Sequence, residues 1–141
     1  MTYKTLKSAT KGLLVGDNVL PKDPDVVLGQ LAMAYNYIAN KCAVMTLMTL
    51  DNSENILRLG QGNYKVRVPE LPENDEDELD IDDDLGYVAA NLIAAYTSKN
   101  KKPYFMQQAE QLILIFNGKI LDMQESFKLN NEGTKYDLPG V

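Results

Sequence analysis

A dense cluster of carboxylates in the middle of the chain is the first candidate for chemistry. Residues 70–84, which we call the acidic segment, hold ten of the twenty Asp and Glu residues and no Lys or Arg. Such a cluster could bind a divalent cation, supply an acid–base pair, or form a solvated surface. The other ten acids face fourteen Lys and Arg residues, so the rest of the chain carries a formal charge of +4. The net charge of −6 is therefore a local property of one segment.

The acidic segment does not match a calcium-binding loop. An EF-hand loop that begins at Asp80 needs Gly at its sixth position and Glu at its twelfth, which hold Leu85 and Asn91. A tuned acid–base pair needs burial, and the segment has few apolar anchors. We therefore expect no metal site and no catalytic carboxylate here. A repulsive surface and a flexible linker remain as the two interpretations.

The remainder of the chain offers no catalytic constellation. It contains no His, so the commonest general base and the usual activator of a Ser or Cys nucleophile are missing. Residues 60–62 join two expected strands and lack the Gly-Lys-Ser/Thr ending of a phosphate-binding loop. Cys42 falls on the inward side of a helical pattern, where we expect a buried, unreactive thiol. The sequence predicts that the protein is not an enzyme and uses no cofactor.

Length and composition predict one soluble domain. A chain of 141 residues with 45% hydrophobic residues can bury a core without disulfides, and a single cysteine cannot form an internal one. No apolar run approaches the roughly 20 residues of a membrane span, and the N-terminus lacks the apolar block of a signal peptide. We expect a protein made in a cytoplasm, with no membrane partner.

Apolar periodicity predicts two helices before the acidic segment. Residues 2–14 repeat apolar positions every three to four residues, and Thr2 can serve as the N-cap. The second helix starts at Asp23-Pro24, an N-cap followed by proline at the first helical position, and should run to about residue 43.

Two further helices are expected after the acidic segment. We expect Asp82, Asp83 and Asp84 to cap the first of them, whose apolar stripe contains Ile81, Leu85, Val88, Leu92 and Tyr96. Pro103 begins the last helix, which should run to about residue 127. Its stripe contains Phe105, Ala109, Leu112, Phe116, Ile120, Met123 and Phe127.

A β-hairpin is expected at about 56–68, because residues 56–59 and 64–68 flank a turn sequence, Gly60-Gln61-Gly62-Asn63. An isolated hairpin is marginal in water, so a third strand should come from residues 44–50 or from a neighbouring subunit. Residues 44–50 are themselves ambiguous between a last helical turn and a strand.

The predicted fold class is mainly α: a small bundle of about four helices, with an inserted β-hairpin and an extended C-terminal tail. Residues 1–127 form the domain, with residues 70–84 as an acidic linker, and residues 128–141 form the tail. The tail lacks periodicity and should order only against a partner. Its candidate anchors are Phe127, Leu129, Tyr136, Leu138 and Val141.

This order of elements resembles that of tailed-bacteriophage head–tail connectors, adaptor proteins that form a ring beneath the portal. The resemblance spans most of residues 2–127 and is one of element order, without a single diagnostic motif. The stretches that carry it are residues 2–17, 20–24, 58–64, 68–72 and 79–82, followed by the two last helices.

The resemblance implies a structural virion protein in the neck of the particle, made in the cytoplasm of a bacterial host. It implies a ring, typically of twelve copies, that contacts the portal protein and a downstream tail or neck protein. Double-stranded DNA would pass through the ring without specific binding, and the C-terminal segment would extend onto the portal. Such adaptors carry no catalytic residues.

Two functions are therefore weighed for the acidic segment. In a connector ring, Asp75, Glu76, Asp77 and Glu78 would line the channel or an outer rim, where like charge keeps DNA from adhering. The alternative is a small acidic binding or regulatory module that mimics nucleic acid and acts on a basic partner.

Overall fold

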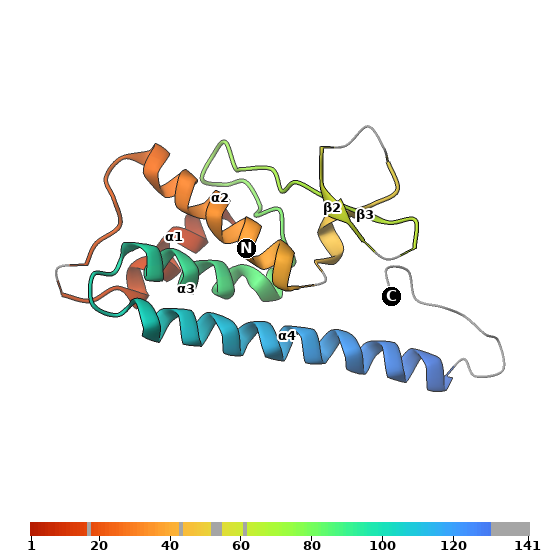
Figure 1. Ribbon diagram of the computed structural model, residues 1–141. Helices are drawn as coiled ribbons and strands as arrows, with labels where there is room; N and C mark the ends of the chain where they lie inside the picture. The colour runs from red at the N-terminus through yellow and green to blue at the C-terminus, as the bar shows by residue number, and fades with distance from the viewer. Residues whose placement is uncertain (17, 43, 52–54, 61, 131–141) are drawn as a thin grey trace.

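A computed structural model describes residues 1–16, 18–42, 44–51, 55–60 and 62–130. The predicted fold class is confirmed: four helices and a small antiparallel sheet form a mainly α domain (Figure 1). None of the described helices is both long enough and apolar enough to cross a membrane.

Helix α3 (Gly86–Thr97) is the central element of the bundle. It is apolar on nearly every side, and a helix of that kind is stable only when other elements surround it. Helices α1 (Tyr3–Leu13), α2 (Pro24–Lys41) and α4 (Lys102–Asn130) all contact it. Its buried apolar side chains are Val88, Ala89, Ala90, Leu92, Ile93, Ala94 and Ala95.

The predicted starts of the first two helices are confirmed. The Thr2 side chain accepts a hydrogen bond from the Thr5 amide at the start of α1. The Asp23 side chain accepts one from the Asp25 amide at the start of α2, and Pro24 occupies the first helical position. Each cap satisfies an amide that has no partner within its helix.

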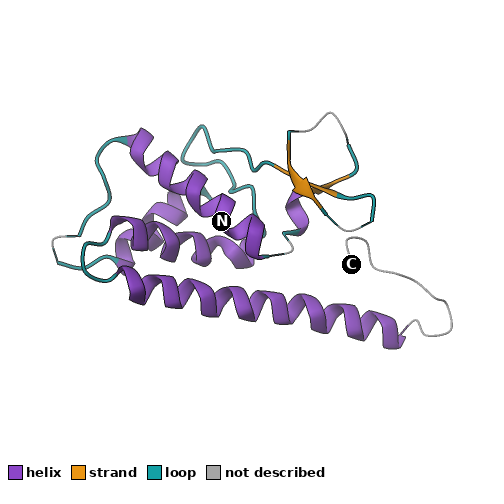
Figure 2. Ribbon diagram, viewed as in Figure 1, coloured by secondary structure: helices purple, strands orange, loops and turns teal. Residues whose placement is uncertain are grey.

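The predicted hairpin is present as β2 (Ile56–Leu59) and β3 (Lys65–Arg67). Its third strand comes from the chain itself: β1 (Met48–Thr49) pairs antiparallel with β3, giving the order β1-β3-β2. A short 3₁₀ turn, η1 (Met45–Leu47), precedes β1. Residues 44–50 are therefore partly helical and partly extended. Figure 2 shows the strands gathered at one end of the helices.

The last helix ends three residues beyond its predicted end. Helix α4 continues to Asn130, so residues 128–130 belong to the helix and not to the tail. For Phe127 and Leu129 only the helical backbone is described, while Tyr136, Leu138 and Val141 lie outside the described residues. Within the predicted stripe, Phe105, Ala109 and Phe116 are buried, and Leu112 and Ile120 are half-buried.

Candidate functional site

The acidic segment is packed against the first turn of α1. The backbone amides of Tyr3 and Lys4 donate to the carbonyls of Asp77 and Asp75, each at 2.9 Å, and the Leu79 amide donates to the Met1 carbonyl at 2.9 Å. Leu79 is also buried in the core. The structure therefore shows residues 75–79 hydrogen-bonded to the domain and anchored in its core by Leu79, in a segment for which the sequence suggested an acidic linker.

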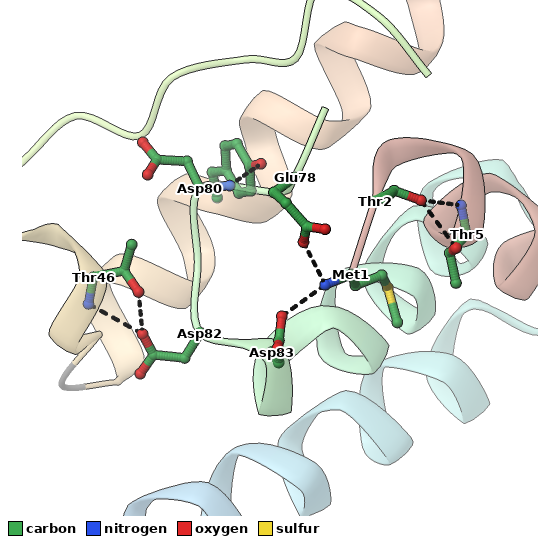
Figure 3. A network of polar contacts seen from close by, with 9 residues as sticks. Met1, Thr2, Thr5, Thr46, Glu78, Asp80, Asp82 and Asp83 are labelled. Atoms are coloured by element: carbon green, nitrogen blue, oxygen red, sulfur yellow. Dashed lines mark hydrogen bonds and ion pairs between the residues drawn. The ribbon is translucent and has the colours of Figure 1, made fainter. Parts of the chain in front are cut away.

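Ion pairs add to these backbone contacts. The Lys7 ammonium lies 2.7 Å from the Asp75 carboxylate. The Met1 α-ammonium lies 2.6 Å from Asp83 and 2.9 Å from Glu78 (Figure 3). Hydrogen bonds to Asp83 and then to Glu78 raise the pKa of this α-ammonium. The pairs join the N-terminus to residues about 70 to 80 positions away in sequence.

Asp80 is the most highly connected acid of the segment. Its carboxylate binds both terminal nitrogens of the Arg67 guanidinium and accepts the Glu70 amide at 2.7 Å. Its own amide donates to the Tyr35 hydroxyl at 3.1 Å. Burial raises the pKa of Tyr35 to about 12, so this hydroxyl stays protonated near neutral pH. The side chains of Arg67 and Asp80 are each only 18% exposed. The pair ties the acidic segment to β3.

The expected capping of the third helix by three aspartates is wrong. A 3₁₀ turn, η2 (Asp83–Leu85), precedes α3, and neither η2 nor α3 has a side-chain cap hydrogen bond. The extra turn separates Asp82 from the first amides of α3. Its carboxylate instead accepts the amides of Met45 and Thr46 at 3.3 and 3.0 Å, which caps η1. Figure 3 shows the contact with Thr46. The carboxylate of Asp83 pairs with the α-ammonium of the first residue.

Three of the four predicted surface acids are engaged within the domain. Asp75 pairs with a lysine, and Glu78 pairs with the α-ammonium. The Asp77 carboxylate accepts the amides of Glu73 and Asn74, each at 2.9 Å, and closes a turn. Within the acidic segment, the acids whose side chains are exposed and have no partner among the described residues are Glu70, Glu73, Glu76 and Asp84. Of these four unpartnered acids, only Glu76 belongs to the predicted set.

Sequence reasoning missed the cationic partners of the acidic segment. These are Lys7, Arg67 and the α-ammonium of Met1. The sequence placed Arg67 in the second arm of the expected hairpin, residues 64–68, but no local pattern indicated which acid it would meet. Contacts between residues that are distant in sequence become visible only in the folded structure.

The thiol of Cys42 is buried as predicted, and burial raises its pKa to about 11. At neutral pH it is therefore a thiol and not a nucleophilic thiolate. In the part of the chain that the structure describes, no three Cys, Asp or Glu side chains are placed to hold a metal ion. No protein-family model, curated protein or solved structure matches this chain.

Proposed function

We propose that this protein is a structural virion protein: a head–tail connector that forms a ring under the portal, joins capsid to tail, and lines part of the DNA channel. The observation that carries the proposal is the set of exposed, unpartnered carboxylates on a segment held in place by backbone contacts. The resemblance in element order over most of residues 2–127 supports the same function.

A fixed acidic surface suits a channel through which DNA passes. DNA adheres to proteins largely because cationic side chains release its condensed counterions. A wall of carboxylates offers no such release, so DNA can slide past it. Since residues 75, 77 and 79 are hydrogen-bonded to the N-terminal segment, the backbone that carries the free carboxylates is joined to the bundle. A ring would repeat that surface once per subunit.

The C-terminal tail remains the proposed contact with the portal. The candidate anchors named from the sequence are Phe127 and Leu129, which lie in the last turns of α4, and Tyr136, Leu138 and Val141, which follow the helix in sequence. Because α4 ends at Asn130, a chain that stops there retains all four helices. That boundary allows the tail to be removed without shortening the bundle.

The fixed acidic surface also favours the second function, a small module that mimics nucleic acid. Carboxylates held in one geometry can bind a basic partner as phosphates do. This function predicts a small species that competes with DNA for that partner, whereas the connector binds a portal ring. Mass photometry of the protein alone and with portal separates the two.

The channel role is tested with a charge-neutralising variant, Glu73→Gln combined with Glu76→Gln. Both side chains are exposed and unpartnered, so fold and ring assembly should be unchanged. DNA should be ejected more slowly from particles that carry the variant, because the channel wall repels it less. Time-resolved DNA release from purified particles measures the effect.

The matched control is Asp25→Asn combined with Asp122→Asn, which removes two exposed carboxylates elsewhere. Its ejection should equal that of the natural protein. Equal slowing of DNA ejection in both variants would show that the net charge of the protein, and not the position of these carboxylates, causes the effect. Loss of ring assembly in Glu73→Gln/Glu76→Gln alone would place the acidic segment in a subunit contact and overturn the channel role.

A further inference from the structure

Helix α4 has an exposed side along its second half. The helix packs on α3, and Figure 1 shows it at the edge of the bundle. Residues four and seven positions apart lie on the same side of a helix, so two adjacent rows form one surface. We call this surface the outer α4 face, and its exposed residues are Leu114, Gly118 and Leu121 in one row and Ile115, Lys119 and Asp122 in the other.

The outer α4 face combines apolar side chains with two free charges. Leu114 is 69% exposed, and Ile115 and Leu121 are each 55% exposed. Single exposed apolar residues are ordinary, but three within two turns of one helix form a patch. The charges of Lys119 and Asp122 have no partner among the described residues. From the end of α4 backwards, the face presents the two charges first and its apolar pair, Leu114 and Ile115, last.

The segment that follows α4 carries the complementary order of residue types. Residues 131–141 lie outside the described residues, and their sequence presents Lys135, then Asp137, then Leu138 and Val141. A chain that reverses direction after α4 would bring Lys135 to the aspartate of the face, Asp137 to its lysine, and the apolar residues to its apolar pair. Gly133 is of a residue type that favours such a reversal.

The lengths of the helix and of the following segment agree with this arrangement. A rise of about 1.5 Å per residue places Asp122 and Leu114 about 12 and 24 Å before the end of α4. At about 3.3 Å per residue, an extended chain lets Lys135 and Val141 reach about 17 and 36 Å from that end. Each residue therefore reaches its counterpart, and the remaining length is sufficient for the turn.

We propose that residues 131–141 fold back antiparallel onto the outer α4 face of the same chain. The segment is joined directly to the helix, so its local concentration at the face is far above that of the same segment in another copy. The contact deepens the proposed connector function, on which its regulatory role rests: Tyr136, Leu138 and Val141, candidate portal anchors, are engaged until the portal displaces them. The fold-back itself does not involve the portal and is measured on the chain alone.

Disulfide trapping tests the contact. The test variant combines Ile115→Cys with Val141→Cys, and the control combines Lys41→Cys with Val141→Cys. The Asn117 side chain donates to the Lys41 carbonyl at 3.1 Å, so exposed Lys41 lies level with the outer α4 face but on the side of α2. In a glutathione buffer, the thiols of the test variant should show an effective concentration at least about tenfold above that of the control. Cys42 is buried, and its thiol is protonated at neutral pH.

Charge reversal tests the register of the contact. Adding Asp122→Lys to the test variant places a like charge opposite Lys135 and should lower the effective concentration roughly threefold, the size expected of an exposed ion pair. Adding Lys135→Asp as well restores an opposite pair and should recover the original value. Failure to recover would show that these two residues do not meet, and it would overturn the register.

Two outcomes of the trapping experiment would overturn the fold-back. Equal effective concentrations in the test and control variants would show that the segment does not prefer the outer α4 face. Disulfides between chains, increasing with protein concentration, would place the segment on a second copy and reject the contact within one chain.

The regulatory role is measured with portal. Lys119→Glu combined with Asp122→Lys keeps the net charge and leaves residues 131–141 intact, but it reverses both charges of the face. If about four in five chains are folded back, their release should raise the apparent affinity for portal roughly fivefold. Unchanged affinity would reject the regulatory role. A chain that folds back without binding portal would keep the contact and reject the connector function, and a chain that binds portal without folding back would do the reverse.

Discussion

At the scale of the residue, position in the fold and not residue type decides what a carboxylate of the acidic segment does. Asp80 binds a guanidinium and an amide and is 18% exposed, whereas Asp84 is exposed with no partner among the described residues. The two aspartates are only four residues apart in sequence. One therefore stabilises the domain, and the other contributes only charge at its surface.

Replacing Asp80 by Asn should lower the free energy of unfolding by about 2 kcal/mol, because Arg67 keeps its partly buried charge and loses the paired carboxylate. Urea unfolding followed by circular dichroism measures the loss. Asp84→Asn makes the same chemical change at an exposed position and should leave the unfolding midpoint unchanged. Equal losses in the two variants would show that general charge, and not the Arg67 contact, is responsible.

At the scale of the element, backbone hydrogen bonds between the acidic segment and α1 separate a packed segment from a linker. The amides of Tyr3, Lys4 and Leu79 are the donors in these bonds. In native-state hydrogen exchange, we expect these three amides to exchange at least about 100-fold more slowly than in an unfolded chain, because exchange requires local opening.

The Glu76 amide is the internal control for that measurement. It has no hydrogen-bond acceptor among the described residues, so it should exchange rapidly. Rapid exchange of all four amides would support the interpretation of the acidic segment as a flexible linker. Two-dimensional NMR spectra recorded after transfer to D₂O resolve the four positions.

The elements that sequence predicted correctly are those with local signals. The caps at Thr2 and Asp23 and the proline at position 24 lie next to the helices that they start, and apolar spacing continues along each helix. The two-residue strand β1 stayed ambiguous because its partner, β3, lies some 16 residues away and determines its conformation. The spacing of apolar residues within residues 44–50 does not indicate that pairing.

The contacts of the acidic segment could not be predicted for the same reason. Asp82 caps η1, which begins 37 residues earlier in the chain, although its position before an apolar stripe suggested the following helix. The pairing of Asp75 with Lys7 spans 68 residues. Composition showed that the segment was acidic, and only the fold shows which acids remain free.

At the scale of the whole molecule, charge is distributed unevenly. Ten carboxylates lie within residues 70–84, and their described cationic partners are Lys7, Arg67 and the Met1 α-ammonium. Repulsive pairs within the segment therefore outnumber attractive ones. Salt at about 0.15 M screens charges over roughly 8 Å, and it weakens long-range repulsion more than short hydrogen-bonded pairs.

We therefore expect the Tm to rise as NaCl increases from roughly 10 mM to 0.15 M. A variant that neutralises the four unpartnered acids, Glu70, Glu73, Glu76 and Asp84, should already have the higher Tm at low salt and should respond little to added salt. Differential scanning calorimetry of both proteins checks this. A Tm that falls with salt would mean that the ion pairs of Lys7, Arg67 and Met1 outweigh the repulsion. If the neutral variant is the more stable, the four acids oppose folding, and their presence is better explained by what the acidic surface repels or binds.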